Sequence, residues 1–221
     1  MTRYPPRMIA VATGLAMLAG MVDAYAFASL GGFFASFMSG NSTRMGVSAI
    51  GGRWDEAMIA ASLLLAFLAG VIAAAIVARA AGGWRKPAVM ALTTLFILTG
   101  GLLAAQGWGA LTLVSLAAAM GAENGVFVRD GEVAIGVTYF TGTLVKLGQK
   151  LAAALMGEAP RWGWVPNLIL WIGFLGGGLT GAWLFATRGA DALWFAGGAA
   201  LAMTLVLAVI TRDGAGAVTA R

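Results

Sequence analysis

The feature that most constrains this chain is a series of charge-free apolar stretches, each long enough to cross a membrane. Four of them occupy residues 58–78, 88–105, 164–187 and 192–211. A helix needs about 20 apolar residues to span the roughly 30 Å hydrocarbon core of a bilayer. The stretches are continuously apolar and do not alternate with polar positions, so they predict helices and not the strands of a membrane barrel. We therefore expect an all-α integral membrane protein in the bacterial inner membrane.

The composition excludes several classes of function. Of the 221 residues only 14 are basic and 9 acidic, whereas about a quarter of the residues in a soluble domain are charged. Cysteine and histidine are both absent, which excludes thiolate zinc sites and His- or Cys-based catalysis. The net charge of +5 is spread over short loops, unlike a nucleic-acid-binding stripe. We expect no enzyme, no catalytic residue, no cofactor or metal and no nucleic-acid partner.

Two further apolar stretches are shorter and each ends at an acidic residue. Residues 8–22 precede Asp23, and residues 107–122 precede Glu123. Each stretch covers only about 22–24 Å as a helix. If these helices span the bilayer, the two acids lie within the membrane or close to its face.

A polar, glycine-containing motif follows each acid and suggests an internal duplication. The motifs are SFMSGNSTRMG at 36–46 and TYFTGTLVKLG at 138–148, and Gly40 and Gly142 are 102 residues apart. The same offset carries 58–78 to 160–180 and 88–105 to 190–207. We therefore expect two repeat units, 1–106 and 107–221, within a single membrane domain. Between the units the alignment pairs Ser39 with Thr141, Asn41 with Thr143, Arg44 with Lys146 and, after a shift of two residues, Asp23 with Glu123.

The distribution of Lys and Arg favours six crossings over eight. Eight crossings would leave seven basic residues inside and five outside. If 32–50 and 133–150 instead enter and return on the same side, ten lie inside and two outside, as the positive-inside rule requires. Six crossings place both termini in the cytoplasm and give each unit an odd number of spans, so the repeats are inverted. Inverted repeats with broken or re-entrant helices are typical of secondary transporters.

The two glycine motifs are the predicted binding site. Their Ser, Asn and Thr residues are good helix N-caps, and a helix that begins there directs free N–H groups and a positive dipole end at a ligand. Arg44 and Lys146 lie one turn further on and add a positive charge to each half, which predicts an anion or carboxylate site. The alternative is that the motifs only cap and pack helices. The predicted solute-binding residues are Ser39, Gly40, Asn41, Thr43, Arg44, Thr141, Gly142, Thr143 and Lys146.

The acids and the small residues leave further alternatives open. Asp23 and Glu123 either form ion pairs with Arg44 and Lys146 or exchange protons with a gradient, and Asn124 adds hydrogen bonds. Small-residue stripes on two of the spans predict close helix packing, within the chain or in a homodimer. These stripes are Gly173, Gly177 and Gly181, and Ser62, Ala66, Gly70, Ala74 and Ala78.

The Val-Asp-Ala around Asp23, the run LGGFFASFMSGNSTRMG and the later TYFTGTLVKLG resemble the YoaK-like bacterial membrane proteins, known as domain of unknown function 1275. The resemblance covers essentially the whole chain and implies six spans but no activity. Two positions depart from the pattern that the resemblance leads us to expect: Glu123, in place of a Gln, and Lys146, in place of an Arg.

These observations predict a transporter or channel for a small anion or carboxylate, embedded in the lipid bilayer. The alternative is a non-transporting assembly factor or sensor whose polar centre is structural. The sequence does not choose between channel and carrier.

Overall fold

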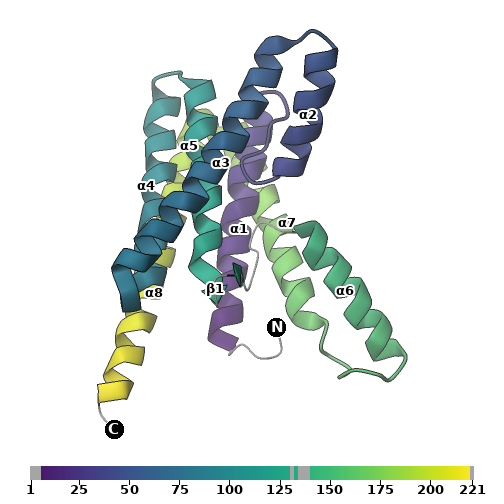
Figure 1. Ribbon diagram of the computed structural model, residues 1–221, viewed down its shortest axis with the longest axis vertical. Helices are drawn as coiled ribbons and strands as arrows, with labels where there is room; N and C mark the ends of the chain where they lie inside the picture. Colours follow the sequence, from purple (N-terminus) through teal and green to yellow (C-terminus); the bar gives the residue numbers. More distant parts are fainter. Residues whose placement is uncertain (1–5, 130–131, 134–139, 220–221) are drawn as a thin grey trace.

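The structure, a computed structural model, describes residues 6–129, 132–133 and 140–219. Within this part the chain consists of helices and short connections, with one two-residue antiparallel ladder between β1 (Val128–Arg129) and β2 (Glu132–Val133). Most of the long α-helices run roughly along the long axis of the molecule, whereas α3 and α6 are tilted away from it (Figure 1). They are α1 (Pro6–Ser29), α2 (Met38–Ile50), α3 (Trp54–Ala81), α4 (Arg85–Ala105), α5 (Gly109–Glu123), α6 (Phe140–Leu155), α7 (Val165–Arg188) and α8 (Ala192–Thr219), with 3-10 turns η1 (Gly82–Trp84), η2 (Asn124–Phe127) and η3 (Gly189–Asp191).

Four helical stretches in the described part are long and apolar enough to cross a membrane. They are Arg7–Ser29, Trp54–Ala105, Gly109–Phe127 and Val165–Asp213. The second and fourth are about twice the length of one crossing, and each contains two helices joined by a three-residue turn, η1 or η3. These lengths and this composition confirm the predicted all-α membrane class.

The two long stretches reverse direction at equivalent glycines. Gly82 ends α3 with φ 52° and ψ −117°, and Gly189 ends α7 with φ 55° and ψ −128°. A side chain would be strained in this backbone region, which is essentially reserved for glycine. Each glycine therefore allows a tight reversal into the next helix, α4 or α8.

Neither of the two acids interrupts the helical segment in which it lies. Helix α1 continues through Asp23 to Ser29, and α5 includes Glu123 before the chain tightens into η2. Both acids are buried inside helical segments, with exposed fractions of 6% and 0%. The remaining predicted spans agree with α3, α4, α7 and α8 to within a few residues at most ends, although α8 continues to Thr219.

Each predicted re-entrant segment contains a short helix. After α1 the chain runs without helix through residues 33–37 and then forms α2, which lies beside α3. In the second half α6 lies beside α7, and residues 134–139 of the predicted segment are outside the described residues. Figure 1 shows α2 and α6 diverging from the middle of the molecule towards opposite ends.

Glycines allow the backbones of two helix pairs to touch. A Cβ on Gly177 of α7 would overlap the carbonyl oxygen of Met17 in α1, and one on Gly20 would overlap that of Phe174. In the α3–α5 pair, Gly70 lies against the Ala118 carbonyl in the same way. In a bilayer such close approach provides the dispersion contacts that hold helices together. Gly70 and Gly177, which belong to the two predicted stripes, are therefore used for packing within the chain.

The two backbone contacts are related by constant spacings. Gly121 meets the Phe67 carbonyl as Gly20 meets that of Phe174, so α1 corresponds to α5 with a spacing of 101 residues (Gly20 to Gly121). Helix α3 corresponds to α7 with a spacing of 107 (Phe67 to Phe174), which differs from the predicted constant offset of 102. The extra residues lie after the start of α6, because α2 and α6 begin 102 residues apart (Met38 to Phe140).

Substitution of Gly177 by Ala tests the α1–α7 contact. The added methyl group has only the Met17 backbone to displace, so we expect the free energy of unfolding to fall by roughly 1–3 kcal/mol, the usual cost of overpacking. The matched control is Gly176→Ala, on the same helix, where nothing lies within 4 Å of the added Cβ. Thermal unfolding of both variants in detergent checks the prediction, and equal melting temperatures would contradict it.

Candidate functional site

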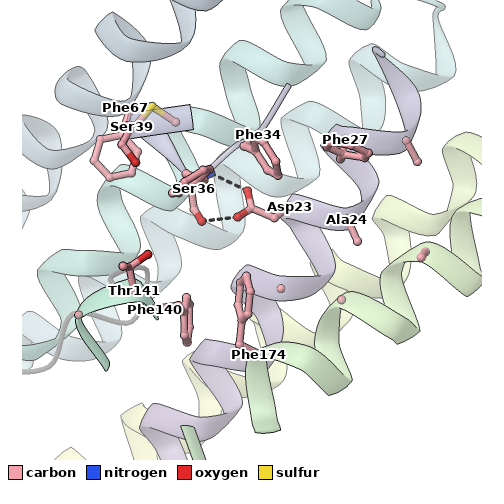
Figure 2. Close-up of a pocket in the computed structure, with 17 residues that line it drawn as sticks. Asp23, Ala24, Phe27, Phe34, Ser36, Ser39, Phe67, Phe140, Thr141 and Phe174 are labelled. Carbon is pink, nitrogen blue, oxygen red and sulfur yellow. Dashed lines mark hydrogen bonds between the residues drawn. The ribbon is translucent and has the colours of Figure 1, made fainter. Parts of the chain in front are cut away.

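A cavity of about 880 Å³ lies where the first turns of α2 and α6 approach the middle of the longer helices. Phe67 and Phe174, near the centres of α3 and α7, form part of its wall, so the cavity is far from the ends of these two helices. Figure 2 shows the residues around it. Its lining consists of Gly20, Asp23, Ala24, Phe27, Ala28, Phe34, Ser36, Phe37, Met38, Ser39, Phe67, Phe140, Thr141, Gly142, Phe174, Gly178 and Ala182.

The predicted meeting of the two glycine motifs occurs in this cavity. Ser39 comes from the first turn of α2, and Thr141 and Gly142 come from the first turn of α6. These residues are about 100 positions apart in sequence but line one space, together with Asp23 of α1. The other predicted solute-binding residues are not part of the lining.

Asp23 fixes the segment that precedes α2. Its Oδ1 accepts hydrogen bonds from the backbone N–H groups of Ala35 (2.8 Å) and Ser36 (2.6 Å), and its Oδ2 accepts one from Ser36 Oγ (2.5 Å) (Figure 2). Hydrogen bonds to a carboxylate are among the stronger ones in proteins. Asp23 therefore has the chain before α2 as its partner, and not Arg44, as one of the sequence alternatives proposed.

The glycine motif of α2 also holds the segment that precedes α2, and it does not cap the helix. Helix α2 begins at Met38, after Phe37, with no side-chain cap. Asn41 is fully buried, donates from Nδ2 to the Phe34 carbonyl (2.7 Å) and accepts from the Phe34 N–H (3.1 Å). Gly40 lies under the Phe37 ring, which a Cβ there would overlap.

Arg44 does not line the cavity and has partners of its own. Its Nη1 donates to the Gly31 carbonyl (2.6 Å), its Nη2 lies 3.4 Å from Oε2 of Glu56, and its guanidinium carbon is 4.0 Å from the centre of the Phe33 ring. Thr43 is exposed and donates to the Ser39 carbonyl. The α2 cation therefore joins α2 to the start of α3 and the preceding loop.

The second half contains no equivalent ion pair in its described residues. Lys146 is exposed on α6 and outside the cavity, and Thr143 is buried. Glu123 is fully buried, and neither of its oxygens has a hydrogen-bond partner among the described residues. Asn124 donates to the Met120 carbonyl (2.9 Å). The alternative that pairs Glu123 with Lys146 is therefore wrong for this structure.

The helix contacts also revise the alignment of the two acids. With the 101-residue spacing set by Gly20 and Gly121, Asp23 corresponds to Asn124, and Glu123 corresponds to Val22. Asn124 therefore stands where the first half has its loop-binding carboxylate. Glu123 therefore has no acidic counterpart in the first half.

Sequence reasoning missed the aromatic wall of the cavity. Six phenylalanines contribute to it, and five of their rings form two contacting groups. Phe34 lies 5.2 Å from both Phe27 and Phe37 between ring centres, and Phe140 stacks on Phe174 at 3.8 Å. The cluster of Phe33, Phe34 and Phe37 beside the glycine motif was the available signal. No cation lines the cavity among the described residues, so the lining does not provide the charge on which the predicted anion site depended.

The long apolar helices define a multi-pass α-helical membrane protein. The chain belongs to the family described as "Protein of unknown function (DUF1275)", whose model matches residues 11–206. A similar protein is a UPF0700 transmembrane protein of Rhizobium meliloti (strain 1021), 32% identical over 204 residues that cover 92% of this chain and 88% of that protein. No solved structure matches the chain. The family resemblance is thereby confirmed, and it brings no established activity with it.

Substitution of Asp23 tests its role in fixing the loop. Asp23→Ala removes the acceptor of the Ala35 and Ser36 amides, so we expect these two amides to exchange with deuterium roughly tenfold faster or more, as the loss of a charge-assisted bond implies. Hydrogen–deuterium exchange of the peptide that contains them measures the effect. Asp55→Asn, at an exposed acid in the first turn of α3, is the matched control. Unchanged exchange in Asp23→Ala would contradict the assignment.

Proposed function

We propose that this protein is a transporter or channel for a small solute, with its binding site in the cavity between α2 and α6. The observation that carries the proposal is the position of the cavity: the first turns of two short helices reach it from the two halves of the chain. Short or broken helices with a terminus beside a central cavity are the form in which transporters expose non-helical backbone inside a membrane.

Three features support six crossings arranged as two inverted units. The α1–α7 and α3–α5 contacts repeat with constant spacings, and Gly82 and Gly189 end equivalent helices with nearly the same backbone angles. Helices α4 and α8 pack together, with Thr94 and Thr204 hydrogen-bonded to each other (3.0 Å). In this arrangement α2 and α6 are the re-entrant segments, and the cavity lies at the interface between the units.

The charge distribution supports an orientation with both termini in the cytoplasm. The start of α1, the α3–α4 turn and the end of α8 lie at one end of the molecule (Figure 1). That end carries Arg7, Arg79, Arg85, Lys86 and Arg212. The opposite end has the α2–α3 and α7–α8 turns, with Arg53 and Arg188. An excess of basic residues marks the cytoplasmic side, in a bacterial inner membrane.

Cysteine labelling tests the proposal directly, because the natural chain contains no cysteine. We expect Ser39→Cys and Thr141→Cys to react with small, membrane-impermeant thiol reagents, because both residues are exposed and line the cavity. In a transporter or channel the reagent reaches each site from the outside and from the inside. Labelling is therefore measured in right-side-out and in inside-out membrane vesicles.

Two controls separate a water-filled path from other reasons for labelling. Leu65 lies on the apolar helix α3 with 68% of its surface exposed, and we expect it to face lipid. A membrane-impermeant reagent should therefore not reach Leu65→Cys through the hydrocarbon core. Ser48→Cys is fully buried within α2 and reports general unfolding. If Ser39→Cys and Thr141→Cys label no faster than these controls, the centre is packed structure, and the non-transporting alternative replaces transport.

A further inference from the structure

The cavity has an unusual combination of charge and aromatic surface for a small-solute site. Asp23 is the only charged residue among the described residues that line it, and its remaining polar side chains are Ser36, Ser39 and Thr141. Most of the rest of the wall is phenylalanine, alanine and glycine. A solute bound there meets one acidic group inside an apolar chamber, and an anionic solute would meet that group without a compensating cation.

The hydrogen bonds of Asp23 indicate how it faces the cavity. Its three partners, the N–H groups of Ala35 and Ser36 and the Ser36 hydroxyl, can all donate to it, so they suit an ionised carboxylate at this position. These bonds come from the loop side of the residue, and Asp23 still contributes to the lining. Two carboxylate oxygens have about four acceptor positions, so one remains after three bonds.

The phenylalanine rings supply a second attraction for positive charge. Phe34 and Phe27 lie on one side of Asp23, and Phe140 and Phe174 lie on the other (Figure 2). The faces of aromatic rings attract cations, and the attraction grows where water is excluded. The same rings bury apolar surface of a solute. Aromatic rings and a carboxylate together are suited to a cation whose charge is carried on an apolar body.

The nearby basic residue does not cancel this preference. The Arg44 guanidinium is held by the Gly31 carbonyl, Glu56 and the Phe33 ring, and Arg44 is not among the residues that line the cavity. Lys146 is exposed and outside the lining. Glu123, the other buried acid, adds negative charge or none, and so does not reverse the sign.

We propose that the cavity binds small organic cations with an aromatic or apolar body, such as quaternary ammonium compounds, between Asp23 and the phenylalanine rings. The proposal rests on the proposed function, because it names the solute class of the same site. It differs from the anion or carboxylate predicted from the sequence.

A matched pair of probes tests the charge preference. Benzyltrimethylammonium and phenylmethanesulfonate have similar size and the same benzyl body but opposite charge. We expect the purified protein to bind the cation at least roughly tenfold more tightly than the anion, as one favourable charge contact implies. Isothermal titration calorimetry measures both affinities, and counterflow of the radiolabelled cation in proteoliposomes measures movement across the membrane.

Two variants assign the preference to its residues. Asp23→Asn removes the charge and should reduce cation affinity roughly tenfold, with little effect on the sulfonate. Because Asp23 also fixes the loop, Phe174→Leu provides a second variant that leaves all three Asp23 hydrogen bonds in place and removes one ring that stacks on Phe140. It should lower cation affinity several-fold. Asp55→Asn, at an exposed acid outside the lining, should bind the cation as the natural chain does.

The outcomes separate this proposal from the one on which it depends. Equal or tighter binding of the sulfonate, no binding of the cation, or a cation affinity that neither Asp23→Asn nor Phe174→Leu changes would overturn the solute class. In that case labelling of Ser39→Cys and Thr141→Cys from both sides still supports a transport path. If those cysteines are inaccessible as well, both proposals fail.

Discussion

The arrangement depends on direct backbone contact between helices of the two halves. Gly177 against Met17 and Gly70 against Ala118 leave no room for a side chain between α1 and α7 or between α3 and α5. In a bilayer the hydrophobic effect does not drive helices together, because lipid tails are as apolar as leucine. Close van der Waals contact therefore holds these pairs, and each pair joins one half of the chain to the other. The cavity lies at this junction, with Gly20 and Gly178 in its wall.

Asp23 connects this scaffold to the first short helix. It belongs to α1, and its carboxylate holds Ala35 and Ser36, just before α2 begins. A buried acid in a membrane helix is costly unless it is paired, and here the pairing is supplied by backbone and hydroxyl donors in place of a cation. This arrangement frees Arg44 for Glu56. The buried charge thereby fixes the loop and leaves the cavity with an acidic wall.

The sequence was sufficient for the membrane class, for the helices α3, α4, α7 and α8, and for the presence of Ser39 and Thr141 in one site. Those features follow from local hydropathy and from a motif that occurs twice. The partners of Arg44 and Asp23 did not follow from the sequence, which offers these two residues to each other as an ion pair. Only the path of residues 30–37 shows that Asp23 binds the loop and that Arg44 binds Gly31 and Glu56. By sequence alone, Asp23 aligns equally well with Glu123 and with its neighbour Asn124. The equivalent contacts of Gly20 and Gly121 set a spacing of 101 residues, which pairs Asp23 with Asn124 and not with Glu123.

The two halves differ most at their short helices, and the difference has a consequence for the cavity. Glu56 follows Arg44 by 12 residues, and Glu158 follows Lys146 by the same number. The first pair is formed at 3.4 Å, whereas Lys146 and Glu158 are both exposed and make no ion pair within the described residues. Asn124 replaces the loop-binding Asp23 in the second half. One wall of the cavity is therefore held by charge-assisted bonds, and the other, α6, packs mainly on α7, partly through Phe140 on Phe174. Of the two matching positions, Asp23 and Asn124, only Asp23 carries an acid, so the described lining of the cavity contains one acidic group where two identical halves would have placed two.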